Sequence, residues 1–108
     1  MKNKKNNDSG TWNHAGGKFI ELGADKLTDP ELLSILIGTG TKGKSAEDIA
    51  TEIIRKYGGF RGMAGQPMEK FLEFKGLGDV KIIRICAAFE MTRRIVNQIL
   101  KEIEYEQN

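Results

Sequence analysis

The stretch from Thr28 to Ser45, "TDPELLSILIGTGTKGKS", decides between two folds. Its second half fits the nucleotide-binding pattern G-x-x-x-x-G-K-[ST], in which a buried strand leads into a glycine-rich loop that holds phosphate. Its first half has the pattern of a helix, because Thr28 and Glu31 have capping-box spacing and Pro30 falls in the first turn, where a missing N–H costs nothing. A P-loop needs a strand in front of its glycines, so we do not expect an NTPase.

The segments on both sides of this stretch also have helical patterns. Ser45 and Asp48 repeat the capping-box spacing in front of "AEDIATEIIRKY", which ends at Gly58. Apolar residues at helical spacing predict three more helices, which are Phe19 to Leu22, Pro67 to Lys75, and one long helix from Asp79 to the end of the chain. We therefore predict an all-α fold, a compact bundle of about five helices that contains a helix-hairpin-helix.

Length and composition limit the kinds of protein that this chain can be. A chain of 108 residues is enough for one domain, and 17 basic against 15 acidic side chains leave a net charge of only +2. A single cysteine, Cys86, excludes an internal disulfide and a multi-cysteine zinc site, and the single histidine, His14, excludes histidine metal clusters. We therefore expect no metal and no cofactor.

The ends and the hydropathy of the chain predict its organisation. No apolar run reaches about 18 residues, so no membrane span is expected, and the N-terminus lacks the apolar core of a secretory signal. A reducing cytoplasm is the expected location. Residues 1–16 are polar and predict a flexible tail, and residues 17–108 predict the helical domain.

The turn "KGLGDVK", Lys75 to Lys81, carries the functional prediction. Two glycines around an apolar residue, between helices, are typical of a helix-hairpin-helix, in which N–H groups at the start of the second helix bind phosphate. Gly76, Leu77 and Gly78 are the expected N–H donors and set the shape of the turn, and Leu77 also anchors it to the core. Lys75 and Lys81 would supply charge. No base edge is read, so binding should be sequence-independent. The alternative is a turn that only reverses the chain.

A weak internal repeat extends this prediction to the first glycine-rich stretch. Gly38-Thr39-Gly40 precedes Gly76-Leu77-Gly78 by 38 residues, with similar apolar spacing in front of each. The P-loop-like stretch is then a second, degenerate hairpin. A second anion site would use Gly40, Lys42, Lys44 and the N–H groups after Ser45. A solvated loop is the alternative reading of the same residues.

Two longer segments resemble a known family. The segment that begins "GGKFIELGADKLTDPELLSILIGTG" and the later "FKGLGDVKIIRICAAFEMTRR" resemble the N-terminal domain of the RadC family (UPF0758), historically labelled DNA repair proteins, from about Gly16 to Arg94. The resemblance implies an all-helical domain with a helix-hairpin-helix, followed in full-length members by a C-terminal JAB-type domain with a zinc-binding His-x-His and Asp signature. His14 is the only histidine here, so that metal chemistry cannot be carried onto this chain.

These observations leave two functional hypotheses from different classes. The first is a non-catalytic DNA-binding module that contacts backbone phosphate through the "KGLGDVK" turn. The second is an interaction or scaffold domain with a structural hairpin, whose long last helix docks the JAB-type domain or another copy. That helix keeps an apolar face beyond the hairpin core, formed by Ile95, Val96, Ile99, Leu100 and Ile103. An enzyme is the least supported reading, because the chain has no catalytic constellation.

Overall fold

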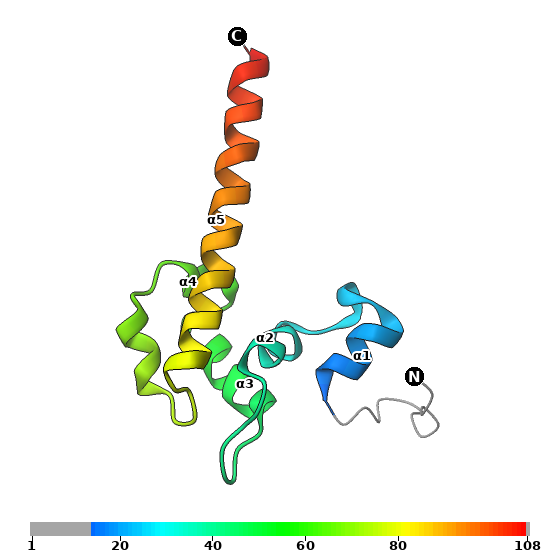
Figure 1. Ribbon diagram of the computed structural model, residues 1–108, viewed down its shortest axis with the longest axis vertical. Coiled ribbons are helices and arrows are strands. Elements are labelled where there is room, and N and C mark those ends of the chain that lie inside the picture. The colour runs from blue at the N-terminus through cyan, green and yellow to red at the C-terminus, as the bar shows by residue number, and fades with distance from the viewer. Residues whose placement is uncertain (1–13, 108) are drawn as a thin grey trace.

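The computed structural model describes residues 14–107, and the regular elements in this range are helices, as predicted (Figure 1). Residues 1–13, most of the predicted tail, lie outside the described residues. None of the described helices has the length and apolar character that crossing a membrane requires. The elements are α1 (Ala15–Leu22), η2 (Ala24–Lys26), α2 (Asp29–Ile37), α3 (Ala46–Tyr57), α4 (Phe60–Ala64), η3 (Met68–Glu73) and α5 (Asp79–Gln107), where η denotes a 3-10 helix.

Both predicted capping boxes are present. The Thr28 hydroxyl accepts a bond from the Glu31 N–H at 3.2 Å, and the Thr28 N–H donates to the Glu31 carboxylate at 2.8 Å. That second bond, together with Lys18, lowers the pKa of Glu31. Ser45 and Asp48 make the matching pair at the start of α3, at 3.0 and 3.1 Å. The element in front of the first glycines is therefore a helix and not the strand of a P-loop.

The core lies where α2, α3, η3 and the first turns of α5 meet (Figure 1). It is built from buried apolar side chains of every one of these elements and of α4, the largest of which are Leu33, Ile37, Ile49, Ile53, Met63, Phe71 and Ile85. Beyond Glu90 every residue of α5 is exposed, and Figure 1 shows this half of the helix projecting away from the other elements. α5 therefore packs into the core along its first half and is exposed to solvent along its second half.

Three details of the helices differ from the sequence prediction. α4 was not predicted, since Gly62 stands in the middle of its five residues. A Cβ at Gly62 would lie 1.9 Å from the Tyr57 carbonyl oxygen, so α4 depends on a glycine to lie against the end of α3. The helix expected from Pro67 is a 3-10 helix that starts at Met68. α1 begins at Ala15 and includes the two glycines that follow it.

Candidate nucleic-acid interface

Leu77 and Gly76 hold the turn between η3 and α5 in place, Leu77 through its buried side chain and Gly76 through its close approach to Ile49 and Thr41. The Leu77 side chain is 4% exposed and belongs to the core. Gly76 has a φ of +90°, and a Cβ there would lie 2.8 Å from Ile49 Cδ1 and 3.0 Å from Thr41 Cγ2. The Leu77 N–H donates to the Phe74 carbonyl at 3.2 Å. Leu77 therefore anchors the turn as expected, but its N–H, expected to face a ligand, already has a partner.

The start of α5 differs from the starts of α2 and α3. Gly78 precedes α5 and has no side chain that could accept a bond from the N–H groups of the first turn. The bond from the Ile82 N–H to the Gly78 carbonyl, 3.0 Å, opens the helix, and the N–H groups before it have no partner within the helix. Gly78 and the first residues of α5 are exposed. This helix start can accept an anion, with the Asp79 carboxylate as the nearest opposing charge.

Lys81 is held by the protein, and Lys75 is not. The Lys81 ammonium donates to the Gly76 carbonyl at 3.2 Å and to the Thr39 carbonyl of the other glycine-rich turn. Lys75 is exposed and makes no ion pair with any residue between 14 and 107. Of the two lysines predicted to supply charge, one therefore joins two turns and the other faces solvent.

The connection between α2 and α3 reverses at Lys42 and Gly43. Thr41 and Lys44 exchange two backbone bonds of 2.9 Å, and Gly43 has a φ of +82°. A Cβ at Gly40 would lie 2.1 Å from the Lys44 carbonyl oxygen. Close backbone packing is therefore enough to explain the glycine at position 40, without a ligand.

The predicted second anion site is largely occupied by partners from the protein. The Lys44 ammonium lies 2.5 Å from the Glu52 carboxylate, and Ser45 is the N-cap of α3, bonded to Asp48. The Asp48 carboxylate therefore stands at the helix start where the sequence suggested phosphate. Lys42 is exposed and has no ion pair within the described part of the chain. Of the four residues named for this site, only Lys42 offers an unpaired charge.

The two glycine-rich turns pack against each other and form one surface. Gly76 lies against Thr41, and Lys81 bonds the Thr39 carbonyl. We call this the paired-turn surface, defined by Lys42, Lys75 and the start of α5. The pairing agrees with the weak repeat in the sequence, but a direct contact between the two turns was not predicted.

Arg84 is a residue of this region that the sequence analysis missed. Its guanidinium donates to the Leu36 carbonyl at the end of α2, at 3.4 Å, and lies 3.5 Å from the position that a Cβ of Gly38 would occupy. Basic side chains commonly bond the last carbonyls of a helix in this way. The only sequence signal was its position three residues after Lys81, on the same side of α5.

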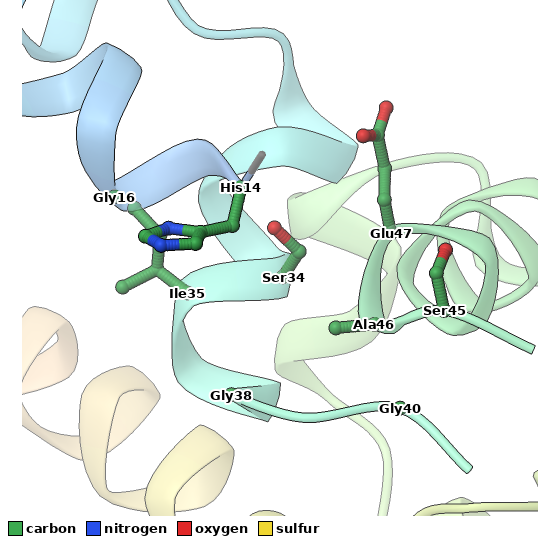
Figure 2. Close-up of a pocket in the computed structure, with 9 residues that line it drawn as sticks. All are labelled: His14, Gly16, Ser34, Ile35, Gly38, Gly40, Ser45, Ala46 and Glu47. Atoms are coloured by element: carbon green, nitrogen blue, oxygen red, sulfur yellow. The ribbon is translucent and has the colours of Figure 1, made fainter. Parts of the chain in front are cut away.

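A pocket of about 480 Å³ lies between the starts of α1 and α3 and the end of α2 (Figure 2). Figure 2 shows His14, just in front of α1, Ser34 on α2 and Glu47 on α3 around this pocket. The Ser34 hydroxyl is already bonded to the Glu31 carbonyl at 2.6 Å. Within residues 14–107, no group of three His, Cys, Asp or Glu side chains could hold a metal ion. Among the described residues, the Ser34 hydroxyl makes no hydrogen bond to His14 or Glu47.

Known proteins resemble this chain over most of its length. A family model described as UPF0758 N-terminal matches residues 17–83. A UPF0758 protein of Marinomonas sp. (strain MWYL1) is 38% identical over 86 residues, which are 79% of this chain and 38% of that protein. A UPF0758 protein of Saccharophagus degradans is 39% identical over 85 residues, again 79% of this chain and 38% of that protein. None of the solved structures compared with the chain matches it significantly.

The chain spans about 38% of the length of the curated relatives that it matches. The matched region of the family model includes α2, α3 and the turn in front of α5. These matches confirm the resemblance to the N-terminal part of the RadC family. The chain therefore belongs to the UPF0758 family.

Proposed function

We propose that this domain is a non-catalytic module that binds the phosphate backbone of DNA without reading its sequence. The observation that supports the proposal is the paired-turn surface, where Lys42 and Lys75 come from turns far apart in the sequence and lack an acidic partner among residues 14–107. The uncapped start of α5 lies beside them. Point charges and backbone N–H groups recognise phosphate and carry no base specificity.

The number of unpaired lysines sets the strength of binding that we expect. Two phosphate contacts predict a salt slope of about −1.8, so the affinity should fall about tenfold between about 50 and about 200 mM salt. Non-specific binding of this kind has dissociation constants of about 10⁻⁴–10⁻⁶ M at physiological salt. Binding by the isolated domain should therefore be weak and strongly salt-dependent.

The test is an NMR titration of the labelled domain with a short DNA duplex at these two salt concentrations. We expect the amides of Gly78 to Lys81 to shift on binding. Lys75→Gln and Lys42→Gln should each lower the salt slope by about 0.9. The matched control is Lys26→Gln, an exposed lysine without an ion pair in the described chain and at the opposite end of α2. Unchanged amide shifts in this region at millimolar DNA would refute the proposal.

A second candidate function, an interaction module, is favoured by the projecting half of α5. Ile95, Val96, Ile99, Leu100 and Ile103 are between 46% and 57% exposed along this one helix. Such a continuous apolar face marks an interaction surface. The JAB-type domain implied by the family resemblance and another copy of the chain are the two partners to consider. We also infer a cytoplasmic location, which the lone free thiol of Cys86 supports.

A further inference from the structure

We propose that a groove beside the start of α5 binds the apolar face of a basic amphipathic helix from a partner protein. η3 and the first turns of α5 lie side by side (Figure 1), and a groove of about 480 Å³ lies between them. This function goes beyond DNA binding and uses apolar side chains outside the paired-turn surface. The groove is lined by Met68, Glu69 and Leu72 of η3 and by Asp79, Ile82 and Ile83 of α5.

The apolar side chains of the groove are open to solvent. Met68, Leu72 and Ile83 are exposed, although they stand around Ile82, which is buried in the core. Val80 precedes Ile83 by three residues, so it lies on the same side of α5, and it is exposed as well. Single exposed apolar residues are common on proteins, but a group of them from two elements around one groove marks a binding surface.

The two charged side chains that line the groove are both acidic. Glu69 comes from η3 and Asp79 from α5, so each wall contributes one carboxylate. Neither carboxylate makes an ion pair with any residue between 14 and 107. A partner that places basic side chains on both flanks of an apolar ridge is therefore complementary to the groove in charge and in polarity.

The other charges of η3 and of the turn after it do not neutralise the two lining carboxylates. Lys70 lies 3.9 Å from the Glu73 carboxylate, which is also bonded to Lys56 at 2.7 Å. Lys75 is exposed and does not line the groove. The groove therefore keeps the negative charge of its two walls.

The charges of α5 near the groove are bonded to other groups. Lys81 and Arg84 donate to backbone carbonyls of the two glycine-rich turns and of the end of α2. Two turns beyond the groove, the Glu90 carboxylate is bonded to Arg93 at 2.7 Å and to Arg94 at 2.9 Å. A helix laid over the groove therefore meets the two lining carboxylates as unpaired charges.

An amphipathic helix is the occupant that fits these walls. Such a helix presents a narrow apolar ridge with lysine or arginine on both flanks, and helix-in-groove binding is a recurring mode of recognition. DNA does not suit the groove, because the carboxylates repel phosphate and the apolar walls offer it no hydrogen bond. A symmetric contact between the grooves of two copies would bring like charges together.

The test is an NMR titration of the labelled chain with a synthetic helical peptide of about 18 residues, in which leucines at helical spacing form one face and lysines form both flanks. We expect the amides of Met68 to Leu72 and of Ile83 to shift, with an affinity that falls as salt is raised. The matched peptide carries glutamate in place of every lysine. It should bind at least about tenfold more weakly, because its flanks repel the carboxylates of the groove.

Two pairs of variants separate the apolar contribution from the charged one. Ile83→Lys should weaken binding of the lysine peptide by at least about tenfold, whereas Ile20→Lys, the same change at an exposed residue of α1, should leave it unchanged. Glu69→Gln should weaken binding by about two- to fivefold at low salt, whereas Glu47→Gln on α3 should not. All four residues are exposed, so these changes should leave the fold intact.

Several outcomes would overturn the proposal: equal binding of the two peptides, equal effects of Ile83→Lys and Ile20→Lys, no shift at millimolar peptide, or shifts confined to the projecting half of α5. Shifts of the groove amides with protein concentration alone would show that a second copy occupies the groove, and would also overturn it. DNA binding is followed through the amides of Gly78 to Lys81 and through the variants of Lys42 and Lys75, so either function can fail without the other.

Discussion

Replacing Lys81 by methionine distinguishes a structural lysine from a phosphate-binding one. Methionine keeps most of the apolar stem and removes the ammonium, which donates to the Gly76 and Thr39 carbonyls. Hydrogen bonds to charged groups each contribute about 1.5–3 kcal/mol when buried, but Lys81 is only half-buried, so we expect a total loss of about 1–2 kcal/mol. For a domain of this size that loss lowers the Tm by about 4–16 °C.

The assay is thermal unfolding followed by circular dichroism, with Lys75→Met as the matched control. Lys75 lies on the same turn and has no ion pair among residues 14–107, so its replacement should change stability by no more than about 0.5 kcal/mol. DNA affinity is then measured well below both Tm values. Lys75→Met should lower it more than Lys81→Met. Equal Tm values for the two variants would refute the reasoning that Lys81 holds the turns together.

Three further predictions concern packing and pH. Gly40→Ala should destabilise the domain more than Gly43→Ala in urea unfolding, because a Cβ at Gly40 would lie 2.1 Å from the Lys44 carbonyl oxygen. A Cβ at Gly43 would meet no atom, so only the positive φ of that residue costs about 1–2 kcal/mol. Phe71→Ala should lower the free energy of unfolding by about 3–5 kcal/mol, because Phe71 is buried beside Tyr57. Leu72 is exposed, so Leu72→Ala should lower it by no more than about 0.5 kcal/mol. Similar losses for the two variants would contradict the assigned core. Arg93 and Arg94 lower the pKa of Glu90 to about 2, so its carboxyl should titrate near that pH in NMR spectra. Because the pKa is lower in the folded state, the ion pairs stabilise the fold above the ordinary pKa of a glutamate, and this stabilisation is lost as the pH falls through about 2. A titration at the ordinary pKa would show that these ion pairs do not persist.

The parts of the fold that local chemistry determines could be predicted from the sequence. The starts of α2 and α3 could be predicted because each capping box, Thr28 with Glu31 and Ser45 with Asp48, is complete within four residues. The long α5 follows from an uninterrupted apolar periodicity. The P-loop-like pattern could be rejected on the same local grounds, since a helix stands where a strand is needed.

The features that could not be predicted depend on contacts between distant residues. α4 forms around a glycine that only the end of α3 explains. Lys81 bonds the carbonyl of Thr39, 42 residues away, and Arg84 bonds that of Leu36, 48 residues away. No local pattern shows that a basic side chain is already bonded by the protein. The sequence therefore predicted the turn and its anchoring by Leu77, and the phosphate site stays a prediction; the division of its lysines into bonded and unpaired ones came from the structure.

The uninterrupted course of α5 has a mechanical consequence. With neither glycine nor proline between Asp79 and Gln107, the helix has no hinge, so it acts as a lever arm fixed in the core at its first turns. The distance from Ile85 to Gln107 is about 33 Å along the axis. A rotation of the domain by about 10° would therefore move the far end by about 6 Å, and whatever binds that end would report the tilt of the paired-turn surface.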